Sequence, residues 1–404
     1  MRRLAAIAGS FPRPFWALWA GTLVNRTGEM VLPFLPLFLV AERGLGVEQA
    51  TVAVSLYGGG SLLGGVVGGT LSDRVGRRAV LLLSLVGGAA CLIAVALVQP
   101  FALLAPTVFA CGLLSEMYRP AVSAAVSDLV PGDDQPRAYA LIYWAINLGV
   151  AIGPVLGGLL AEWTFTALFV VDGVTMLVYA AVVVVAVPET RPDVPPPAAD
   201  APRVRRADAL RGALADGPLV GLALAMLGVG LGFVQLFSTL PLAMDADGLR
   251  PLDYGLTISI NGGLIVLLSL PVSTWVGRRI GGLAPALGVA LIGVGLAVTA
   301  PAHTLAGYAV GAVLWTLGEM AFLPIVPTLV SRLAPPAWRG TYQGVYHGAW
   351  GLAKTLGPAL GGLVFARLGP AWVWGGASAL AFAASVGMVA LRPAFRRRLG
   401  LDAG

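Results

Sequence analysis

The chain has 404 residues, of which 57% are hydrophobic and only 11% are charged, whereas soluble globular domains average about 25% charged residues. This composition excludes an ordinary soluble protein. The formal net charge of +6 would suggest nucleic-acid binding in a soluble protein, but the arginines here fall between apolar runs. Membrane orientation explains the charge better, and we expect no nucleic-acid partner.

Apolar runs of about 20 residues, each able to cross a bilayer as a helix, recur along the whole sequence. The ten-residue alternating segments of a transmembrane barrel do not. We therefore predict an all-α polytopic membrane protein in a lipid bilayer, with twelve transmembrane helices. The predicted spans are residues 14–40, 47–70, 78–98, 101–129, 137–162, 166–187, 218–243, 253–276, 283–301, 304–330, 340–366 and 370–391.

A stretch rich in proline and arginine separates the sixth span from the seventh. It predicts a first six-helix bundle at 1–187, a flexible cytoplasmic linker at 188–217, a second six-helix bundle at 218–391 and a basic cytoplasmic tail at 392–404. Of the 26 Lys and Arg residues, 20 fall on the side that carries both termini and three on the other side, with three inside spans. Positive residues accumulate in cytoplasmic loops, so both termini are predicted to be cytoplasmic.

Charged residues inside spans are the main candidates for function, because such a side chain costs about 2.5–3.5 kcal/mol at the bilayer centre on insertion scales. Span 1 carries Asn25, Arg26 and Glu29, and span 4 carries Glu116 and Arg119. Both Arg/Glu pairs are three residues apart, so each can pair on one helix face. Salt bridges that only hold the bundle together are the alternative interpretation.

Residues 69–78, between spans 2 and 3, read Gly-Thr-Leu-Ser-Asp-Arg-Val-Gly-Arg-Arg and fit the pattern G-x-L-[SA]-D-R-x-G-R-[RK]. Glycines allow a tight turn between close helices, and arginines can anchor to phosphate headgroups. The plainer interpretation is that these arginines only set the topology. The residues singled out here are Gly69, Asp73, Arg74, Gly76, Arg77 and Arg78, together with Asp128 at the end of span 4.

Span 5 carries a glycine motif, Gly149-x-x-x-Gly153-Pro154-x-x-Gly157-Gly158. Glycines at helical spacing form a groove for close helix packing, and the proline bends the helix; generic packing is the alternative interpretation. Asp172 in span 6 has no evident role in transport, and we expect a local pairing or an interfacial position for it.

The two halves of the chain repeat one another. Residues 153–159 (Gly-Pro-Val-Leu-Gly-Gly-Leu) recur at 357–363 (Gly-Pro-Ala-Leu-Gly-Gly-Leu), an offset of 204. Glu116-Met117 recurs as Glu319-Met320 at an offset of 203, and residues 71–78 have an echo at 272–279. Offsets near half the chain length predict two pseudo-symmetric halves, related by an axis along the membrane normal, with a central site between them.

Glu319 in span 10 has no basic residue in its own span, so it must be protonated, paired with a distant cation such as Lys354, or hydrated. An apolar setting favours the protonated form of a carboxyl group, and Glu319 is therefore the first candidate for a proton-coupling residue. Glu29 and Glu116 follow. Aromatic side chains bind varied lipophilic molecules and stack on cations, although ordinary packing is the alternative for each of them. The candidate cavity residues are Asn25, Arg26, Tyr118, Arg119, Tyr143, Asn147, Trp315, Phe322, Tyr346 and Lys354.

With the loop motif, the span 5 motif and the repeat, nearly the whole chain resembles the major facilitator superfamily, in particular its twelve-span drug:proton antiporters. The resemblance implies the major facilitator fold, alternating access, and a cavity lined by spans 1, 4, 7 and 10. It also implies that Asp73, Arg77 and Asp128 form a charge relay that latches the cytoplasmic gate. Motifs like the one in span 5 are associated with proton-driven export in the similar proteins.

The predicted function is proton-coupled efflux of amphipathic drugs or related small molecules. One alternative is a transporter for one defined metabolite, such as a sugar, an amino acid or a self-made antibiotic, since arginines in a cavity suit anionic groups. A non-transporting sensor or lipid-handling scaffold is another. We expect no enzyme activity, no cofactor and no metal, a monomer, and a location in the bacterial cytoplasmic (inner) membrane, with protons and a small-molecule substrate as partners.

Overall fold

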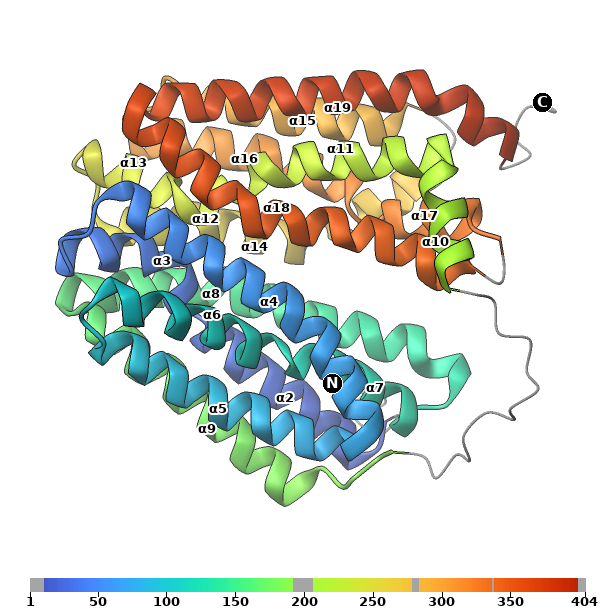
Figure 1. Ribbon diagram of the computed structural model, residues 1–404, viewed down its shortest axis with the longest axis horizontal. Helices are drawn as coiled ribbons and strands as arrows, with labels where there is room; N and C mark the ends of the chain where they lie inside the picture. Colours follow the sequence, from blue (N-terminus) through green and yellow to red (C-terminus); the bar gives the residue numbers. More distant parts are fainter. Residues whose placement is uncertain (1–10, 192–205, 278–282, 336–337, 399–404) are drawn as a thin grey trace. The chain divides into compact units, whose positions relative to one another are not determined.

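The computed structural model describes residues 11–191, 206–277, 283–335 and 338–398. Every regular element within these ranges is a helix (Figure 1). Ten helical segments of this part are long and apolar enough to cross a membrane, and Ala284–Thr299 is a shorter apolar helix. The prediction of an all-helical, multi-pass membrane protein is thus confirmed, while the count of twelve spans stays a prediction.

The chain divides into two compact units, Met1–Val194 with Arg250–Gly263, and Pro195–Leu249 with Leu264–Gly404. The first unit contains the helices α2 (Arg13–Gly28), α3 (Val31–Leu37), η1 (Phe38–Glu42), α4 (Val47–Val75), α5 (Arg77–Leu97), α6 (Phe101–Glu116), α7 (Tyr118–Leu129), η2 (Gly132–Asp134), α8 (Gln135–Trp163) and α9 (Phe165–Ala186). It also includes the first half of α14 (Pro251–Gly277).

The second unit contains the second half of α14 and the remaining helices. These are α10 (Arg206–Ala215), α11 (Gly217–Phe233), α12 (Gln235–Ser238), α13 (Leu240–Ala246), α15 (Ala284–Thr299), α16 (Leu305–Phe322), α17 (Val326–Leu333), α18 (Arg339–Leu368) and α19 (Pro370–Arg398). The echo of the loop motif at 272–279 ends outside the described residues.

Two predicted segments differ from the structure. The range 188–217, predicted as a flexible linker, contains the helix α10, and this helix packs on α18. A side chain on Gly212 of α10 would overlap the Trp338 ring just before α18. The predicted tail at 392–404 begins inside α19, which continues as a helix to Arg398.

Interruptions occur in the first, fourth, seventh and tenth predicted spans. Span 1 is divided into α2 and α3, span 4 into α6 and α7, span 7 into α11, α12 and α13, and span 10 into α16 and α17. The helices of the other eight predicted spans are continuous within the described residues. Interrupted helices free backbone groups that can serve ligand sites in transporters, so these four spans are the first places to search for function.

Small residues determine the packing of α4. Side chains on Gly60, Gly64 or Gly68 would overlap the backbone at Phe109, Leu113 or Met117, respectively. Both sets follow a spacing of four residues, so one face of α4 lies directly on the backbone of α6 and the start of α7. The glycines act as small-residue packing positions of the kind found between membrane helices.

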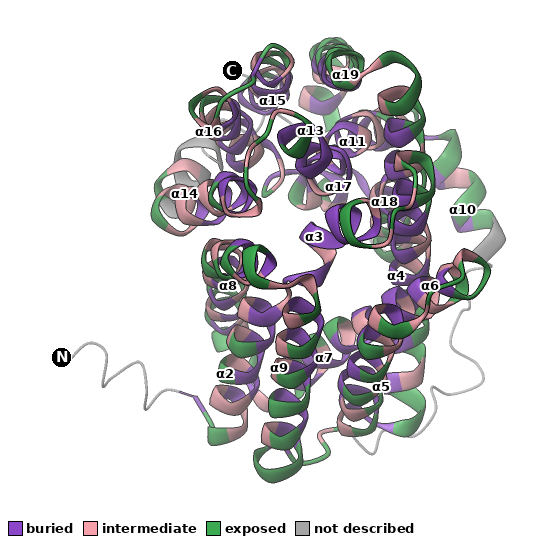
Figure 2. Cartoon of the chain, turned by 90° about the vertical axis from the view of Figure 1, so that its left-hand side faces the viewer, coloured by how far each residue is buried: buried purple, intermediate pink, exposed green. Residues whose placement is uncertain are grey.

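Each unit has its own apolar core. Phe34 and Tyr179 are fully buried in the first unit, as are Phe322 and Trp374 in the second. Large apolar side chains are also found on the outside, where helices such as α5 and α9 carry green exposed surface in Figure 2. Val185 is 86% exposed. A soluble monomer rarely exposes large contiguous apolar surface, whereas a surface of this kind suits contact with lipid.

Candidate functional site

Span 1 breaks at Glu29. Helix α2 ends at Gly28, the backbone N–H of Met30 donates to the Gly28 carbonyl at 2.7 Å, and α3 begins at Val31. The freed N–H of Val31 donates to the Asp172 carboxylate of α9 at 3.3 Å. Asp172 is only 5% exposed. The expected interfacial position for Asp172 is therefore wrong: this side chain is buried against the break in span 1.

Two ion pairs meet next to this break. Arg26 pairs with Glu29, and Arg119 pairs with Glu116 at 2.6 Å, which are the two pairs expected from the three-residue spacing. Glu29 also lies 4.0 Å from the Arg119 guanidinium. Arg26 donates a hydrogen bond to the Tyr118 hydroxyl as well. We call these five residues the charge cluster; its members come from α2, α6 and α7 and from the break itself.

Burial makes this charge cluster sensitive to change. The side chain of Arg26 is 5% exposed and that of Glu116 is 9% exposed, whereas that of Arg119 is 48% exposed. Removing one partner of a buried pair is costly because an uncompensated charge is left behind. Since Glu29 contacts both arginines, a change of charge on Glu29 would alter both pairs at once.

The glycine motif of α8 packs on this same region. A side chain on Gly149 would overlap Arg26, and one on Gly153 would lie 2.9 Å from the Thr27 carbonyl oxygen. A side chain on Gly157 would lie 2.8 Å from Phe34. These glycines allow α8 to approach the span 1 break more closely than any larger residue would permit.

The two remaining motif positions face a further segment. A side chain on Gly158 would lie 2.6 Å from Leu252, and the carbonyl of Pro154 lies where a side chain on Gly255 would be. Leu252 and Gly255 belong to the same unit as α8. The span 5 motif therefore packs closely inside the first unit, with Gly149, Gly153 and Gly158 on backbone atoms and Gly157 on side chains.

A pocket lies inside the first unit beside the break. Asn25, Glu29, Tyr57, Tyr118 and Asp172 contribute polar groups to its wall, and side chains such as Leu92, Val95 and Met176 contribute apolar ones. Of these residues, Asn25, Glu29 and Tyr118 were predicted as site residues. Tyr57 was not, since an isolated tyrosine in an apolar span resembles ordinary core.

Tyr143 and Asn147 of α8 are not among the residues of this pocket. The Asn147 amide donates to the Tyr143 carbonyl one turn earlier at 2.9 Å, while the Tyr143 side chain is 51% exposed. The role of both residues in substrate binding stays a prediction.

The second unit gathers aromatic residues. Trp315 and Tyr346 are buried, and Phe322 is fully buried. The Phe233 ring, which the sequence analysis did not select, lies 6.0 Å from Trp315 and 5.6 Å from Trp350 between ring centres. Phe233 ends α11 at the first interruption of span 7, and a broken apolar helix leaves no periodic signal that would mark it.

Polar residues accompany the interruptions of the second unit as well. Gln235, the first residue of α12, donates to the carbonyls of Leu231 at 2.9 Å and Gly357 at 2.8 Å. A side chain on Gly361 would overlap the Gln235 amide. Glu319 of α16 and Lys354 of α18 are half-buried. The span 11 copy of the glycine motif thus packs on interrupted span 7, as the span 5 motif packs on span 1.

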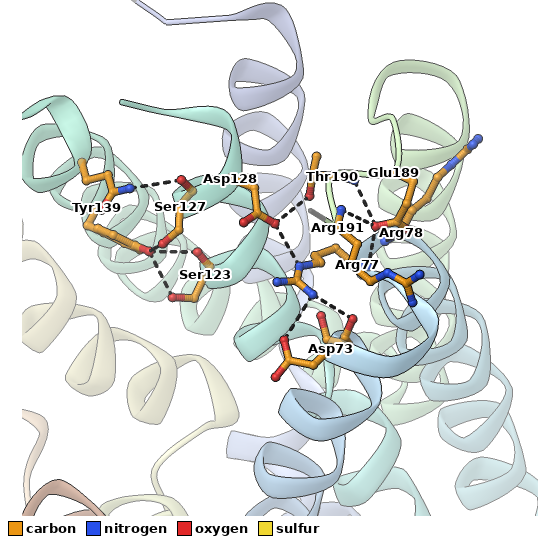
Figure 3. Close-up of polar contacts among 12 residues, drawn as sticks. Asp73, Arg77, Arg78, Ser123, Ser127, Asp128, Tyr139, Glu189, Thr190 and Arg191 are labelled. Atoms are coloured by element: carbon orange, nitrogen blue, oxygen red, sulfur yellow. Dashed lines mark hydrogen bonds and ion pairs between the residues drawn. The ribbon is translucent and has the colours of Figure 1, made fainter. Parts of the chain in front are cut away.

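The gate motif forms a charged network at one end of the first unit (Figure 3). Arg77 contacts Asp73 at 3.2 Å and Asp128 at 2.9 Å, and it donates to the Ser72 carbonyl at 3.0 Å. The motif is not an extended loop, because α4 continues to Val75. The turn is made by Gly76 alone, at φ 111°, in the left-handed region that favours glycine.

Glu189 completes this network and was missed by the sequence analysis. Its carboxylate accepts the backbone N–H of Arg77 at 2.8 Å and that of Arg78 at 3.2 Å (Figure 3). These two N–H groups begin α5 and have no partner within the helix. Burial by itself would raise the pKa of Glu189, but the backbone N–H groups that donate to it outweigh burial and hold the pKa below its usual range.

The residues next to Glu189 add contacts. Thr190 donates to Asp128 at 3.3 Å, and Arg191 donates to the Arg74 carbonyl. Arg78 reaches the Val184 carbonyl of α9 at 2.6 Å. Gly69 makes no close approach, since a side chain there would lie 3.8 Å from Pro120. The motif is therefore held mainly by Arg77 and by the segment that follows α9.

Comparison with known proteins places this geometry in context. A family model described as Major Facilitator Superfamily matches residues 18–358. The crystal structure of a mutant form of the peptide transporter POT has a TM-score of 0.78 at 20% identity and covers 96% of each chain. A structural likeness at this low identity supports the fold and nothing finer.

Three relatives from bacteria are similar in sequence. The uncharacterized MFS-type transporter YqjV of Bacillus subtilis is 26% identical over 86% of this chain and 85% of its own length. The Na(+), Li(+), K(+)/H(+) antiporter of Planococcus maritimus is 22% identical over 83% of this chain and 85% of its own. The quinolone resistance protein NorA of Staphylococcus aureus is 25% identical over only 33% of this chain and 34% of its own.

Proposed function

This chain belongs to the Major Facilitator Superfamily, and we propose that it exports amphipathic drugs or related small molecules in exchange for protons, by alternating access. It is a multi-pass membrane transporter rather than an enzyme. The proposal includes twelve spans in two pseudo-symmetric six-helix bundles. It also includes a monomer in the bacterial inner membrane with both termini in the cytoplasm.

The charge cluster is the observation that supports proton coupling. Glu29 lies at an interrupted helix and contacts Arg26 and Arg119 together. Protonation of this carboxyl would remove the charge that holds both guanidinium groups, and the arginines would then rearrange around Glu116. Uptake of a proton at Glu29 would therefore change the side-chain contacts between α2 and α7.

Glu319 and Glu116 are the other candidate coupling residues. Glu319 occupies the position of Glu116 in the second half of the chain, and Phe322 stands where Arg119 would be. The equivalent placement of the two glutamates, each in an interrupted span, supports Glu319 as a coupling residue. We propose that Glu319 and Glu29 both change protonation during the transport cycle, with Glu116 acting through Arg119.

Two relatives support the direction and the substrate class. The antiporter of Planococcus maritimus exchanges cations for protons according to its name, and NorA is named for quinolone resistance. Antiport and drug export are carried over to this chain as parts of the proposal. The close packing of the span 5 motif on the charge cluster supports antiport further, because it ties the motif to the groups that would carry the proton.

Dye accumulation in inside-out vesicles with an imposed proton gradient tests the proposal. Wild-type protein is expected to accumulate a lipophilic cationic dye, and Glu319→Gln and Glu29→Gln are expected to lose this uptake while still binding the dye. Asp133→Asn, at an exposed turn, serves as the control and is expected to behave as wild type. Dye uptake that continues unchanged after the proton gradient is collapsed would refute proton coupling.

A transporter of one anionic metabolite is the second candidate. The half-exposed guanidinium of Arg119 favours it, since arginine forms paired hydrogen bonds with carboxylate and phosphate groups. Arg26 does not favour it, because its guanidinium is already occupied by Glu29 and Tyr118. Saturable transport of a single anion, with no response to cationic dyes, would decide for this alternative.

A further inference from the structure

The pocket inside the first unit contains more acidic groups than its surroundings balance. Around the break in span 1 lie three carboxylates, those of Glu29, Glu116 and Asp172, and two guanidinium groups, those of Arg26 and Arg119. Glu29 and Glu116 are each within 4.0 Å of an arginine. Among the described residues, no basic side chain lies within that distance of Asp172, whose carboxylate is approached by two backbone N–H groups, that of Val31 at 3.3 Å and that of Met30.

A surplus carboxylate is costly in this position. Asp172 is 95% buried, given its exposure of 5%, and a buried charge is strongly unfavourable unless a counter-charge or hydrogen bonds compensate it. The two backbone N–H groups of Met30 and Val31 are neutral donors and offset only part of the charge. The pocket therefore calls for one additional positive charge, which either a proton or a small cation can supply.

Asn25 is a second and independent sign of a missing ligand. It lines the same pocket, is only 4% exposed, and its amide oxygen has no hydrogen-bond partner. Buried polar atoms are nearly always paired, and an unpaired one calls for an explanation such as a bound ion. A proton on Asp172 would neutralise that carboxyl but would not by itself satisfy the Asn25 oxygen, whereas a cation can bind both oxygens.

The donor set limits the class of ion. Asn25, Glu29 and Asp172 offer amide and carboxylate oxygens, and the hydroxyls of Tyr57 and Tyr118 lie in the same wall. Oxygen ligands suit hard cations. The carboxylates of this wall are those of Glu29 and Asp172, and Glu29 also pairs with Arg26, so the charge available suits a monovalent ion better than a divalent one.

We infer that the pocket formed by Asn25, Glu29 and Asp172 at the break in span 1 binds a small monovalent cation such as Na⁺. The interrupted backbone contributes to this site, because carbonyls at the ends of discontinuous helices coordinate Na⁺ in transporters. The cation replaces the missing counter-charge of Asp172 and occupies the Asn25 oxygen. Protons compete for the same carboxylates, so binding weakens as the pH falls.

Equilibrium binding of ²²Na⁺ to the purified full-length protein in lipid nanodiscs, with choline chloride keeping the ionic strength constant, tests this inference. We expect saturable binding at pH 8 that Li⁺ displaces and choline does not. Asp172→Asn and Asn25→Ala should each weaken binding by about tenfold or more, since the loss of even a supporting group costs metal sites 10- to 100-fold. Asp133→Asn is the matched control at an exposed turn, and we expect wild-type binding from it.

Two results would overturn the inference. One is that the wild-type protein binds no ²²Na⁺ above the choline background at pH 8, with a proton supplying the missing positive charge instead. The other is unchanged ²²Na⁺ binding in a folded Asp172→Asn or Asn25→Ala variant; if Asp172→Asn does not fold, Asn25→Ala decides alone. Because the assay needs neither a gradient nor a drug, it can succeed where proton-coupled export fails, and the reverse also holds.

Discussion

The contribution of Arg26 to stability depends on Glu29, and the contribution of Glu29 depends on Arg26. Arg26 has one guanidinium nitrogen on Glu29 and another on the Tyr118 hydroxyl, and its Nε atom has no partner although it is buried. The desolvation of these charges is offset only while the pair is complete. Single substitutions here are thus expected to be worse than double ones.

Arg26→Met is expected to lower the free energy of unfolding by about 3 kcal/mol, the typical cost of removing one partner from a buried pair. The double variant Arg26→Met/Glu29→Leu should recover about 1–2 kcal/mol of this loss, because the Glu29 carboxylate, which loses its partner in Arg26→Met, is removed as well. Chemical denaturation in mixed micelles measures both values. A double variant that is less stable than Arg26→Met would show that the pair itself is not what matters.

Glu189 gives a pH-dependent contribution at the start of α5. Because its pKa is held below the usual range, the contact stabilises the folded protein fully above the ordinary glutamate pKa of about 4.3, and this stabilisation is lost as the pH falls through the lowered value. Glu189→Gln should therefore cost about 0.5 kcal/mol at pH 7, as expected for an exposed carboxylate at a helix N-terminus.

Hydrogen exchange at the Arg77 and Arg78 amides is the direct measurement. Faster exchange in Glu189→Gln at pH 7, with the difference from wild type shrinking below pH 4, would agree with the cap. An equal difference at both pH values would exclude a role for the ionised carboxylate. Asp133→Asn should leave the exchange of both amides unchanged.

At the scale of helices, α4 shows how glycine positions decide packing. Gly64 and Gly65 are neighbouring glycines in the same helix. A side chain on Gly64 would overlap the backbone at Leu113, whereas a side chain on Gly65 would meet no atom within 4 Å. The two positions therefore separate steric cost from helix propensity within a single turn.

Gly64→Ala should destabilise the protein by about 2 kcal/mol, because α4 and α6 must move apart to admit a methyl group. Gly65→Ala should be neutral or stabilising by up to about 1 kcal/mol, since alanine favours helix more than glycine does. Thermal unfolding of both variants in the same detergent compares them. Equal losses at the two positions would contradict the close packing of α4 on α6.

The positions of the helices could be predicted from sequence because a helix that crosses the bilayer needs a long apolar run, and short polar turns separate these runs. The interruption at Glu29 could not, since its stability depends on a hydrogen bond to Asp172, 141 residues away. Glu189 was missed for a similar reason. Its function as a cap requires the end of α9 to meet the start of α5, and no local pattern encodes that meeting.

For the whole molecule, the distribution of arginines is the main evidence for orientation. The turn at Asp133 and the turn after α13 near Asp245 are predicted to lie on opposite sides of the membrane, and both residues are exposed. Lysine and arginine bias sets the orientation of short loops. The prediction therefore concerns the entire chain and not one loop.

Cysteine labelling checks this orientation in a Cys91→Ser/Cys111→Ser background. Asp133→Cys should react with a membrane-impermeant maleimide in inside-out vesicles but not in intact cells, and Asp245→Cys should show the opposite pattern. Labelling of both positions from the same side would mean that the number of spans between them is even, and the predicted arrangement would be wrong.

The repeated glycine motif fixes a steric contact at an interrupted span in each unit. In the first unit, Gly157 packs on the interrupted span that carries Arg26 and Glu29; in the second, Gly361 packs on the one that carries Gln235. A side chain at either glycine would collide with its neighbour, so a larger residue at either position would force the interrupted span to move. The polar residues on the two spans differ, so such a movement would disturb an ion pair in the first unit but only an uncharged amide in the second.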